Sequence, residues 1–205
     1  MKRGYELDIT VKKLTPELAE DYIDYFDNRA FSDGNKEKGC YCVWHHWTEK
    51  CEYERSLLPE SERACCKRNY AKELIQSGRL NGFAAFCGGE MVGFCNADRK
   101  SSYFRLGGER GSGDDKILSV VCFTVAPDMR RRGIAKALLT GACRYAKENG
   151  FDLVEGYPKT GEFSVSDCGG SVSMYVEQGF DIIEVKDGII ARKINNKSSK
   201  ETSVK

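Results

Sequence analysis

The sequence lacks any large excess of charge of one sign. Its 205 residues include 32 lysines and arginines against 31 aspartates and glutamates, which gives a formal net charge of +1. A balance this close to zero creates no overall field that would hold a nucleic acid or an anionic membrane surface. We therefore expect neither partner, and any phosphate group must be bound by a local cluster of basic residues.

Long hydrophobic runs are also missing. No stretch approaches the ~20 apolar residues that a membrane-spanning helix needs. Residues 1–10 alternate charged and apolar side chains and contain no signal-peptide core. We therefore expect a cytoplasmic protein without membrane partners, either a monomer or a homodimer.

Cysteine, by contrast, is abundant, with ten residues. Such a number suggests disulfides in a small secreted protein, but this chain is long and has no export signal. We interpret the cysteines as mostly free thiols, several of them within apolar stretches, as Cys122 is. The 40% hydrophobic content fits one folded domain over residues 1–194, followed by a disordered polar tail at 195–205.

The hydrophobic pattern changes between strand and helix periods along the chain. A continuous apolar run at 116–125, a helical pattern, a second strand and a second helix together predict a βαβα unit in an α/β (α+β) fold. Thr15 and Ser61 are expected to cap helices, and the glycine-rich residues 107–115 to form a mobile loop. The predicted strands cover 6–14, 80–86, 91–97, 116–125, 151–157, 180–185 and 188–193, and the predicted helices cover 16–31, 61–76, 131–149 and 171–178.

The junction between the 116–125 strand and the following helix is rich in cations. Four basic side chains surround the predicted helix start, where unpaired N–H groups and the helix dipole favour an anion. Gly133 allows a ligand to approach the backbone closely. A phosphate or pyrophosphate fits such a place, although neither a dinucleotide-binding Gly-x-Gly-x-x-Gly nor a Walker loop is present. The basic residues are Arg130, Arg131, Arg132 and Lys136.

Two motifs carry a resemblance. Arg130-x-x-Gly133-x-Ala135, after a strand ending Val125-x-Pro127, resembles the acetyl-CoA signature of the GNAT N-acetyltransferase superfamily. About 40 residues later, Tyr175-Val-Glu-Gln-Gly-Phe180 is similar to that family's second motif. The resemblance covers most of the chain from residue 80 to 193, while residues 30–75 match loosely, as acceptor-side segments do.

The resemblance implies a mixed, mostly antiparallel sheet, flanked by helices and splayed near Val125, with acetyl-CoA in the opening. It also implies direct attack on the thioester by a primary amine of a small molecule or a peptide, in a ternary complex. The implied pantetheine-binding residues are Phe123, Thr124 and Val125, and the implied pyrophosphate-binding residues are Arg130, Arg131, Arg132, Gly133, Ile134, Ala135 and Lys136.

By the resemblance, Tyr175 occupies the position of the family's general acid. A phenol can serve in that role, because it can protonate a departing thiolate. Its alternative role is packing in the core. Glu155, near a strand end, is a candidate base if burial raises its pKa; a water relay or a salt-bridged glutamate are the alternatives. Cys168 stands where many family members have a cofactor-contacting asparagine. This departure favours, as an alternative, an inactive CoA-binding regulatory protein of the same fold.

The segment 39–51 holds both tryptophans and both histidines. Its cysteines suggest zinc, and hence a zinc-dependent interaction module as a distant alternative. However, Cys40 and Cys42 would point to opposite faces of an extended chain, so we expect no metal. Aromatic side chains here could instead line the acceptor pocket or cap the core. The candidate substrate-binding residues are Tyr41, Trp44 and His45.

Overall fold

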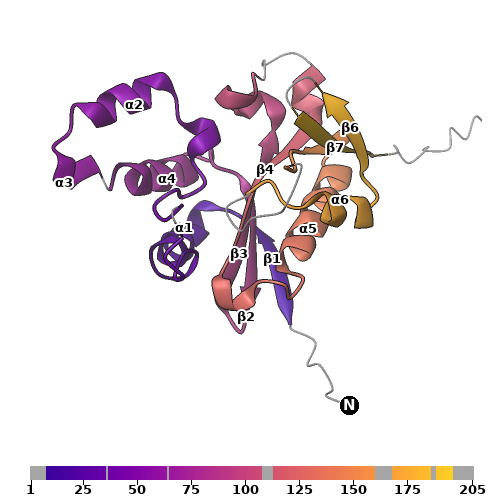
Figure 1. Ribbon diagram of the computed structural model, residues 1–205, viewed down its shortest axis with the longest axis horizontal. Coiled ribbons are helices and arrows are strands. Elements are labelled where there is room, and N and C mark those ends of the chain that lie inside the picture. Colours follow the sequence, from indigo (N-terminus) through magenta and orange to yellow (C-terminus); the bar gives the residue numbers. More distant parts are fainter. Residues whose placement is uncertain are drawn as a thin grey trace, which may run out of the picture.

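The computed structural model describes residues 8–35, 37–63, 65–107, 113–159, 168–185 and 188–195. Within them, seven strands form one sheet in the order β1-β2-β3-β4-β5-β7-β6 (Figure 1). Strands β4 and β5 are parallel, and the other neighbouring pairs are antiparallel, which confirms a mixed, mostly antiparallel sheet. The strands are β1 Ile9–Lys13, β2 Gly82–Cys87, β3 Glu90–Arg99, β4 Ile117–Val125, β5 Leu153–Gly156, β6 Asp181–Val185 and β7 Gly188–Ile194.

The sheet opens between its two parallel strands. The last register pair of β4 and β5 is Val120 with Gly156, and β4 continues to Val125 beyond it. Next to this point β4 carries an extra residue opposite β3, because the register shifts between Asn96 and Ala97. A bulge of this kind bends a strand and increases its twist. The splay expected near Val125 is therefore present.

Helices cover both sides of the sheet (Figure 1). On one side lie α1 and α4 with the extension formed by α2 and α3, and on the other side lie α5 and α6. The buried residues Leu138, Leu139 and Ala142 of α5 follow its predicted apolar stripe. Over the described residues, no helix has the length and apolarity to cross a membrane. The helices are α1 Ala19–Asp24, α2 Glu49–Ser56, α3 Glu60–Arg63, α4 Cys66–Gln76, α5 Ile134–Glu148 and α6 Val172–Glu177.

The helix predicted over 61–76 is wrong in its extent, because α3 and α4 are separate. The first of them begins at Glu60, one residue earlier than expected, and the carbonyl of the preceding Pro59 accepts from the amides of Glu62 and Arg63. Ser61 therefore lies inside α3 and does not cap it. Thr15 precedes a short 3-10 turn and makes no side-chain cap bond there.

Several expectations lie outside the described residues. These are the start of the first strand at 6–7, most of the glycine-rich loop at 108–112, the connection at 186–187 between the last two predicted strands and the tail at 196–205. The described end of the glycine-rich loop, Gly113–Lys116, forms a 3-10 turn that leads into β4.

Candidate functional site

The chain enters α5 through a loop that exposes backbone N–H groups. Arg131 and Gly133 have left-handed φ angles of 60° and 83°, so the helix begins at Ile134, three residues later than predicted. The first bond in the helix runs from the Ala137 amide to the Gly133 carbonyl, at 2.9 Å. The amides of residues 134–136 precede that bond and point out of the helix end. This end therefore offers consecutive donors for an anion.

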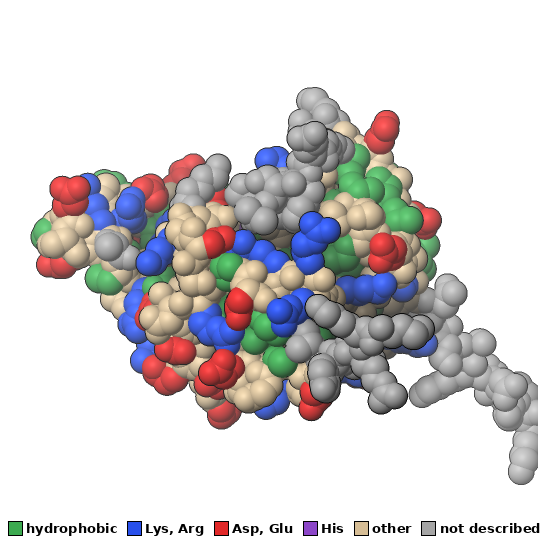
Figure 2. Space-filling model, turned by 60° about the horizontal axis from the view of Figure 1, so that its bottom comes forward, with side chains coloured by type: hydrophobic (Ala, Val, Ile, Leu, Met, Phe, Trp, Pro, Cys, Tyr) green, Lys and Arg blue, Asp and Glu red, His purple; other side chains and the backbone are tan. Residues whose placement is uncertain are grey.

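Open space surrounds the Gly133 backbone. A Cβ atom there would meet nothing within 4 Å, so the left-handed φ, rather than crowding, disfavours larger residues. Arg131 and Arg132 are exposed beside it, and Lys136 pairs with Glu177 at 3.1 Å. Lysine and arginine side chains lie across the middle of the face in Figure 2, interspersed with acidic ones.

Arg130 differs from its two neighbours. Its Nη1 pairs with Asp33 at 2.5 Å, and its Nε donates to the carbonyl of Val125 at 3.3 Å. Charge pairing on one side and a backbone bond on the other hold this guanidinium against the end of β4. It therefore supports the loop, while Arg131 and Arg132 are the arginines that face solvent.

The free edge of β4 is partly occupied by the chain itself. The Phe123 amide points away from β3 and donates to the carbonyl of Cys168 at 2.6 Å. Because peptide groups alternate along a strand, Val125 presents its backbone to the same edge and Thr124 to β3. The edge predicted to bind pantetheine therefore exists, but the segment at Cys168 takes its central donor.

Tyr175 fills the opening between β4 and β5. It is fully buried on α6, a helix capped by the Ser171 hydroxyl, and its own hydroxyl donates to the Gly169 carbonyl at 3.0 Å. A Cβ atom at Gly156, the last residue of β5, would collide with the tyrosine ring. Burial raises the pKa of Tyr175 well above its ordinary value, so the phenol keeps its proton at neutral pH.

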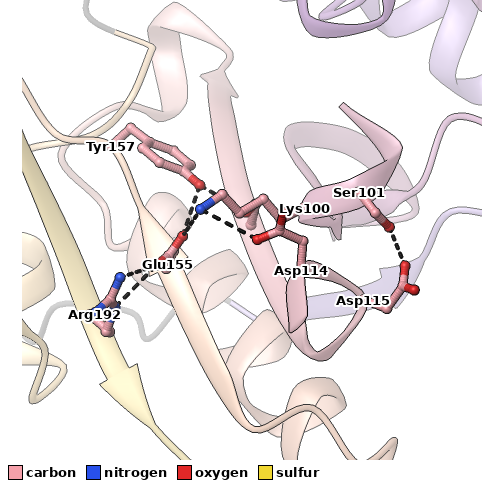
Figure 3. Close-up of polar contacts among 8 residues, drawn as sticks. Lys100, Ser101, Asp114, Asp115, Glu155, Tyr157 and Arg192 are labelled. Atoms are coloured by element: carbon pink, nitrogen blue, oxygen red, sulfur yellow. Dashed lines mark hydrogen bonds and ion pairs between the residues drawn. The ribbon is translucent and has the colours of Figure 1, made fainter. Parts of the chain in front are cut away.

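Glu155 lies in a buried cluster of charges (Figure 3). Its Oε1 accepts from Arg192 at 2.5 and 3.0 Å, and its Oε2 lies 3.4 Å from the Lys100 ammonium and accepts from Tyr157 at 3.2 Å. Side chains alternate along a strand, so Glu155 faces the side of β5 opposite to Tyr175. The two predicted catalytic side chains are thus separated by the sheet, and both Glu155 oxygens already have partners.

Two adjoining cavities lie on the other side of β4 from Tyr175. A cavity of about 410 Å³ reaches β4 itself, and a neighbouring one of about 490 Å³ shares Lys38, Gly39 and Lys67 with it. The loop at 37–45 and strand β4, which borders the opening towards β5, thus line the same cavity. The first cavity is lined by Glu37, Lys38, Gly39, Cys40, Cys42, Trp44, His45, Lys67, Cys122 and Cys168.

The three predicted substrate-binding residues all line these cavities, in different ways. Trp44 is 51% exposed, with the Arg105 guanidinium 3.8 Å from its ring centre. Tyr41 lines the second cavity but is mostly buried, and its hydroxyl donates to Asp27. The aromatic segment is therefore a cavity wall at Trp44, whereas Trp47, at 3% exposure, caps the core.

One ring nitrogen of His45 has no hydrogen-bond partner among the described residues. This atom is the buried Nδ1, and among the same residues Nε2 of His46 also lacks a partner. Burial, and then the charge of Arg105, lower the pKa of His45 to about 4. The imidazole is therefore neutral at pH 7.

Cys40 and Cys42 line the same cavity, so the expectation that they face opposite ways is wrong. It assumed an extended backbone, whereas Tyr41 and Cys42 have left-handed φ angles of 48° and 47°. Sequence reasoning also missed that Cys42, Cys122 and Cys168 meet, because no spacing links positions on three separate segments. Among the described residues, no group of three or more histidine, cysteine or acidic side chains is arranged to hold a metal ion.

A sequence profile of the acetyltransferase (GNAT) family matches residues 43–158. The chain belongs to the GNAT family. The match begins within the loop at 37–45 that lines the cavities, continues through β2–β5, and includes the loop that leads into α5. No curated protein matches the sequence significantly.

Solved structures of GNAT proteins share this fold at low identity. PaiA N-acetyltransferase from Thermoplasma acidophilum, in complex with coenzyme A, is 17% identical with a TM-score of 0.52, over 92% of this chain and 99% of its own. An N-acetyltransferase from Staphylococcus aureus Mu50 is 12% identical with a TM-score of 0.53, over 91% and 98%. The Escherichia coli ribosomal-protein-S18-alanine N-acetyltransferase is 14% identical with a TM-score of 0.50, over 96% and 99%.

Membership of the GNAT family makes this protein an acyltransferase. The family match ends at residue 158, before Cys168 and Tyr175.

Proposed function

We propose that this acyltransferase moves the acetyl group of acetyl-CoA to a primary amine. One observation carries the proposal: the outward-facing amides at residues 134–136 follow β4, whose residues beyond Val120 do not pair with β5. A pyrophosphate fits the first feature and an extended amide chain fits the second. The coenzyme A complex of the PaiA relative supports the same pairing of ligand and fold.

The residues present fit such a ligand. The amides of residues 134–136 would hold the pyrophosphate, with Arg131 and Arg132 adding charge at the solvent side. The backbone of Val125 would align the pantetheine arm, once the Cys168 carbonyl gives up the Phe123 amide. When bound, acetyl-CoA supplies an activated acetyl thioester. The cavity at β4, with Trp44 and His45 in its wall, would place the amine opposite it.

The two proton transfers are assigned to different groups. Tyr175 is the proposed acid, because its buried phenol is protonated and lies at the end of the β4–β5 pairing. Glu155 is a poor base, because Arg192, Lys100 and Tyr157 already occupy its oxygens. We therefore favour a water relay in the cavity as the route by which the amine loses its proton.

A second candidate function is coenzyme A binding without turnover. The bond from Phe123 to Cys168 and that from Tyr175 to Gly169 favour it, because both close the opening where the thioester would lie. Release of free coenzyme A separates the two functions, since a binding protein would form the complex and release none.

The proposed function is tested first by binding. A ligand at 100 times its Kd stabilises a protein by about 2.7 kcal/mol, so acetyl-CoA is expected to raise the thermal midpoint of the wild type. Gly133→Glu puts a carboxylate at the proposed pyrophosphate position and is expected to abolish the shift. Gly150→Glu is the matched control, because Gly150 follows the other end of α5 with a φ of 73° and equally open space.

Turnover is then measured as coenzyme A release with a panel of primary amines. Release with at least one amine, lost in Gly133→Glu and kept in Gly150→Glu, is expected. A midpoint shift without release from any amine would support the binding function. The absence of any shift in the wild type would overturn both.

A further inference from the structure

Two cysteines distant in sequence meet in the wall of the cavity of about 410 Å³ at β4, the proposed acceptor cavity. The sulfurs of Cys42 and Cys122 are 2.8 Å apart, although 80 residues separate them in the chain. Both side chains are free thiols, exposed by only 2% and 6%. The Thr124 hydroxyl lies 3.3 Å from the Cys42 sulfur on the same side of β4. The contact joins the loop at 37–45 to the central strand.

Buried hydrogen bonds fix the loop side of this contact. The Tyr22 hydroxyl donates to the Tyr41 carbonyl at 2.7 Å, and the Asn96 side chain donates to the Cys42 carbonyl at 2.8 Å. The Asn96 oxygen in turn accepts from Tyr103 at 2.7 Å. A non-glycine residue in the left-handed region carries a conformational cost. The surrounding side chains hold Cys42 in that conformation, so its sulfur is presented to β4.

Small molecules can reach the pair. Cys42 and Cys122 both line the cavity of about 410 Å³, and Cys168 lies at its edge. The thiol of Cys168 hydrogen-bonds Cys122 and lowers its pKa, but the contact with Cys42 and burial outweigh this effect, so the pKa of Cys122 lies well above its ordinary value. The Cys122 sulfur thus contacts both of the other thiols.

We propose that Cys42 and Cys122 form an oxidisable dithiol that a small hydroperoxide converts to a disulfide. The Cys42 thiolate, beside the Thr124 hydroxyl, attacks the peroxide oxygen, and the O–O bond breaks, leaving a sulfenic acid and one water after protonation. The Cys122 thiolate then attacks that sulfur, and a second water leaves. Two thiols and one hydrogen peroxide become one disulfide and two waters. The bond would tie the cavity wall to β4.

The test uses the whole protein and hydrogen peroxide as the probe. Burial raises the pKa of Cys42, so the reaction is run at pH 8.5, where more thiolate is present. Remaining thiols are alkylated, and a non-reducing peptide map identifies any cross-link by mass. We expect a peptide pair joining Cys42 to Cys122, removed by dithiothreitol, and a thermal midpoint several degrees higher in the oxidised protein, because the bond closes a long loop.

The variants give a matched comparison. Cys42→Ser is expected to lose the cross-link and the rise in midpoint, whereas Cys143→Ser, at a half-buried cysteine of α5, keeps both. If Cys42→Ser does not fold, the peptide map of the wild type alone decides. A Cys122–Cys168 cross-link in its place, or full alkylation of Cys42 and Cys122 after peroxide, would overturn the proposal. The readout is a covalent bond, so it stands apart from acetyl transfer.

Discussion

The two halves of the site are built in different ways. The side facing α5 uses backbone amides from one continuous stretch, Val125 to Lys136, whose conformation depends on Gly133. The cavity proposed for the acceptor uses side chains from the 37–45 loop, α4, β4 and the segment at Cys168. A site made of backbone amides tolerates most side-chain changes, and a short local stretch of sequence specifies it. A cavity made of side chains from several segments forms only on folding, so single substitutions there can show what each residue contributes.

The largest effect is expected at the boundary between the halves. Tyr175→Phe keeps the ring that packs on Phe123 and Phe180 but removes the hydroxyl. Loss of a positioned acid costs about 10²- to 10⁴-fold in rate. We expect kcat for coenzyme A release to fall by about that factor, while the acetyl-CoA thermal shift remains. An unchanged kcat would remove Tyr175 from the mechanism and leave it a packing role.

The second effect separates stability from chemistry at Glu155. Glu155→Gln removes the buried carboxylate that the partly exposed Arg192 and Lys100 share, and the loss of such hydrogen bonds costs about 1–3 kcal/mol. Glu177→Gln breaks the exposed pair with Lys136 and is the matched control, with an expected cost of about 0–1 kcal/mol. Chemical denaturation measures both. Equal free energies of unfolding in the two variants would contradict a structural role for Glu155.

A third prediction concerns acid sensitivity of the acceptor side. Burial first, followed by Arg105 for His45 and by His45 for His46, lowers the pKa of each histidine from 6.5 to about 4. Above pH 6.5 both are neutral in the folded and unfolded states. As the pH falls from 6.5 towards 4, only the unfolded chain takes up these protons, so the free energy of unfolding decreases, by on the order of 3 kcal/mol per histidine.

His45 and His46 are the only histidines in the chain, so one double variant isolates their effect. Wild type and His45→Gln/His46→Gln are unfolded by urea at pH 7.5 and pH 4.5. The wild type is expected to lose more stability between the two pH values, because the double variant keeps only the carboxylate contribution. Parallel losses would show that the imidazoles are solvated.

The contrast between the halves also explains what could be predicted from sequence. The strand before α5, the glycine turn and the helix predicted at 171–178 are local patterns, and the structure has each of them. The start of α5 was misplaced because helical spacing does not reveal the left-handed φ at Arg131. The meeting of Cys42 with Cys122 depends on contacts of Tyr22 and Asn96, far away in the sequence.

The smallest expected effect concerns the two lysines in the walls of the cavities. Lys38 and Lys67 line both cavities, and among the described residues neither makes an ion pair. We therefore predict that the proposed acceptor side favours an amine that also carries an anionic group. A cation at a half-exposed site contributes about 0.5–1 kcal/mol to such binding, which corresponds to a two- to fivefold change in kcat/KM.

Phosphoethanolamine and ethanolamine form a matched pair of probes, since they differ by the phosphate alone. Lys67→Met is expected to lower kcat/KM for the first and leave the second unchanged. Lys72→Met on the same helix is the control, because Lys72 pairs with Glu20 and does not line either cavity. If Lys67→Met lowers kcat/KM equally for both amines, the lysine acts by shaping the cavity wall, through its contact with the Trp47 ring at 6.0 Å. That result would contradict recognition of the acceptor's negative charge by this cavity.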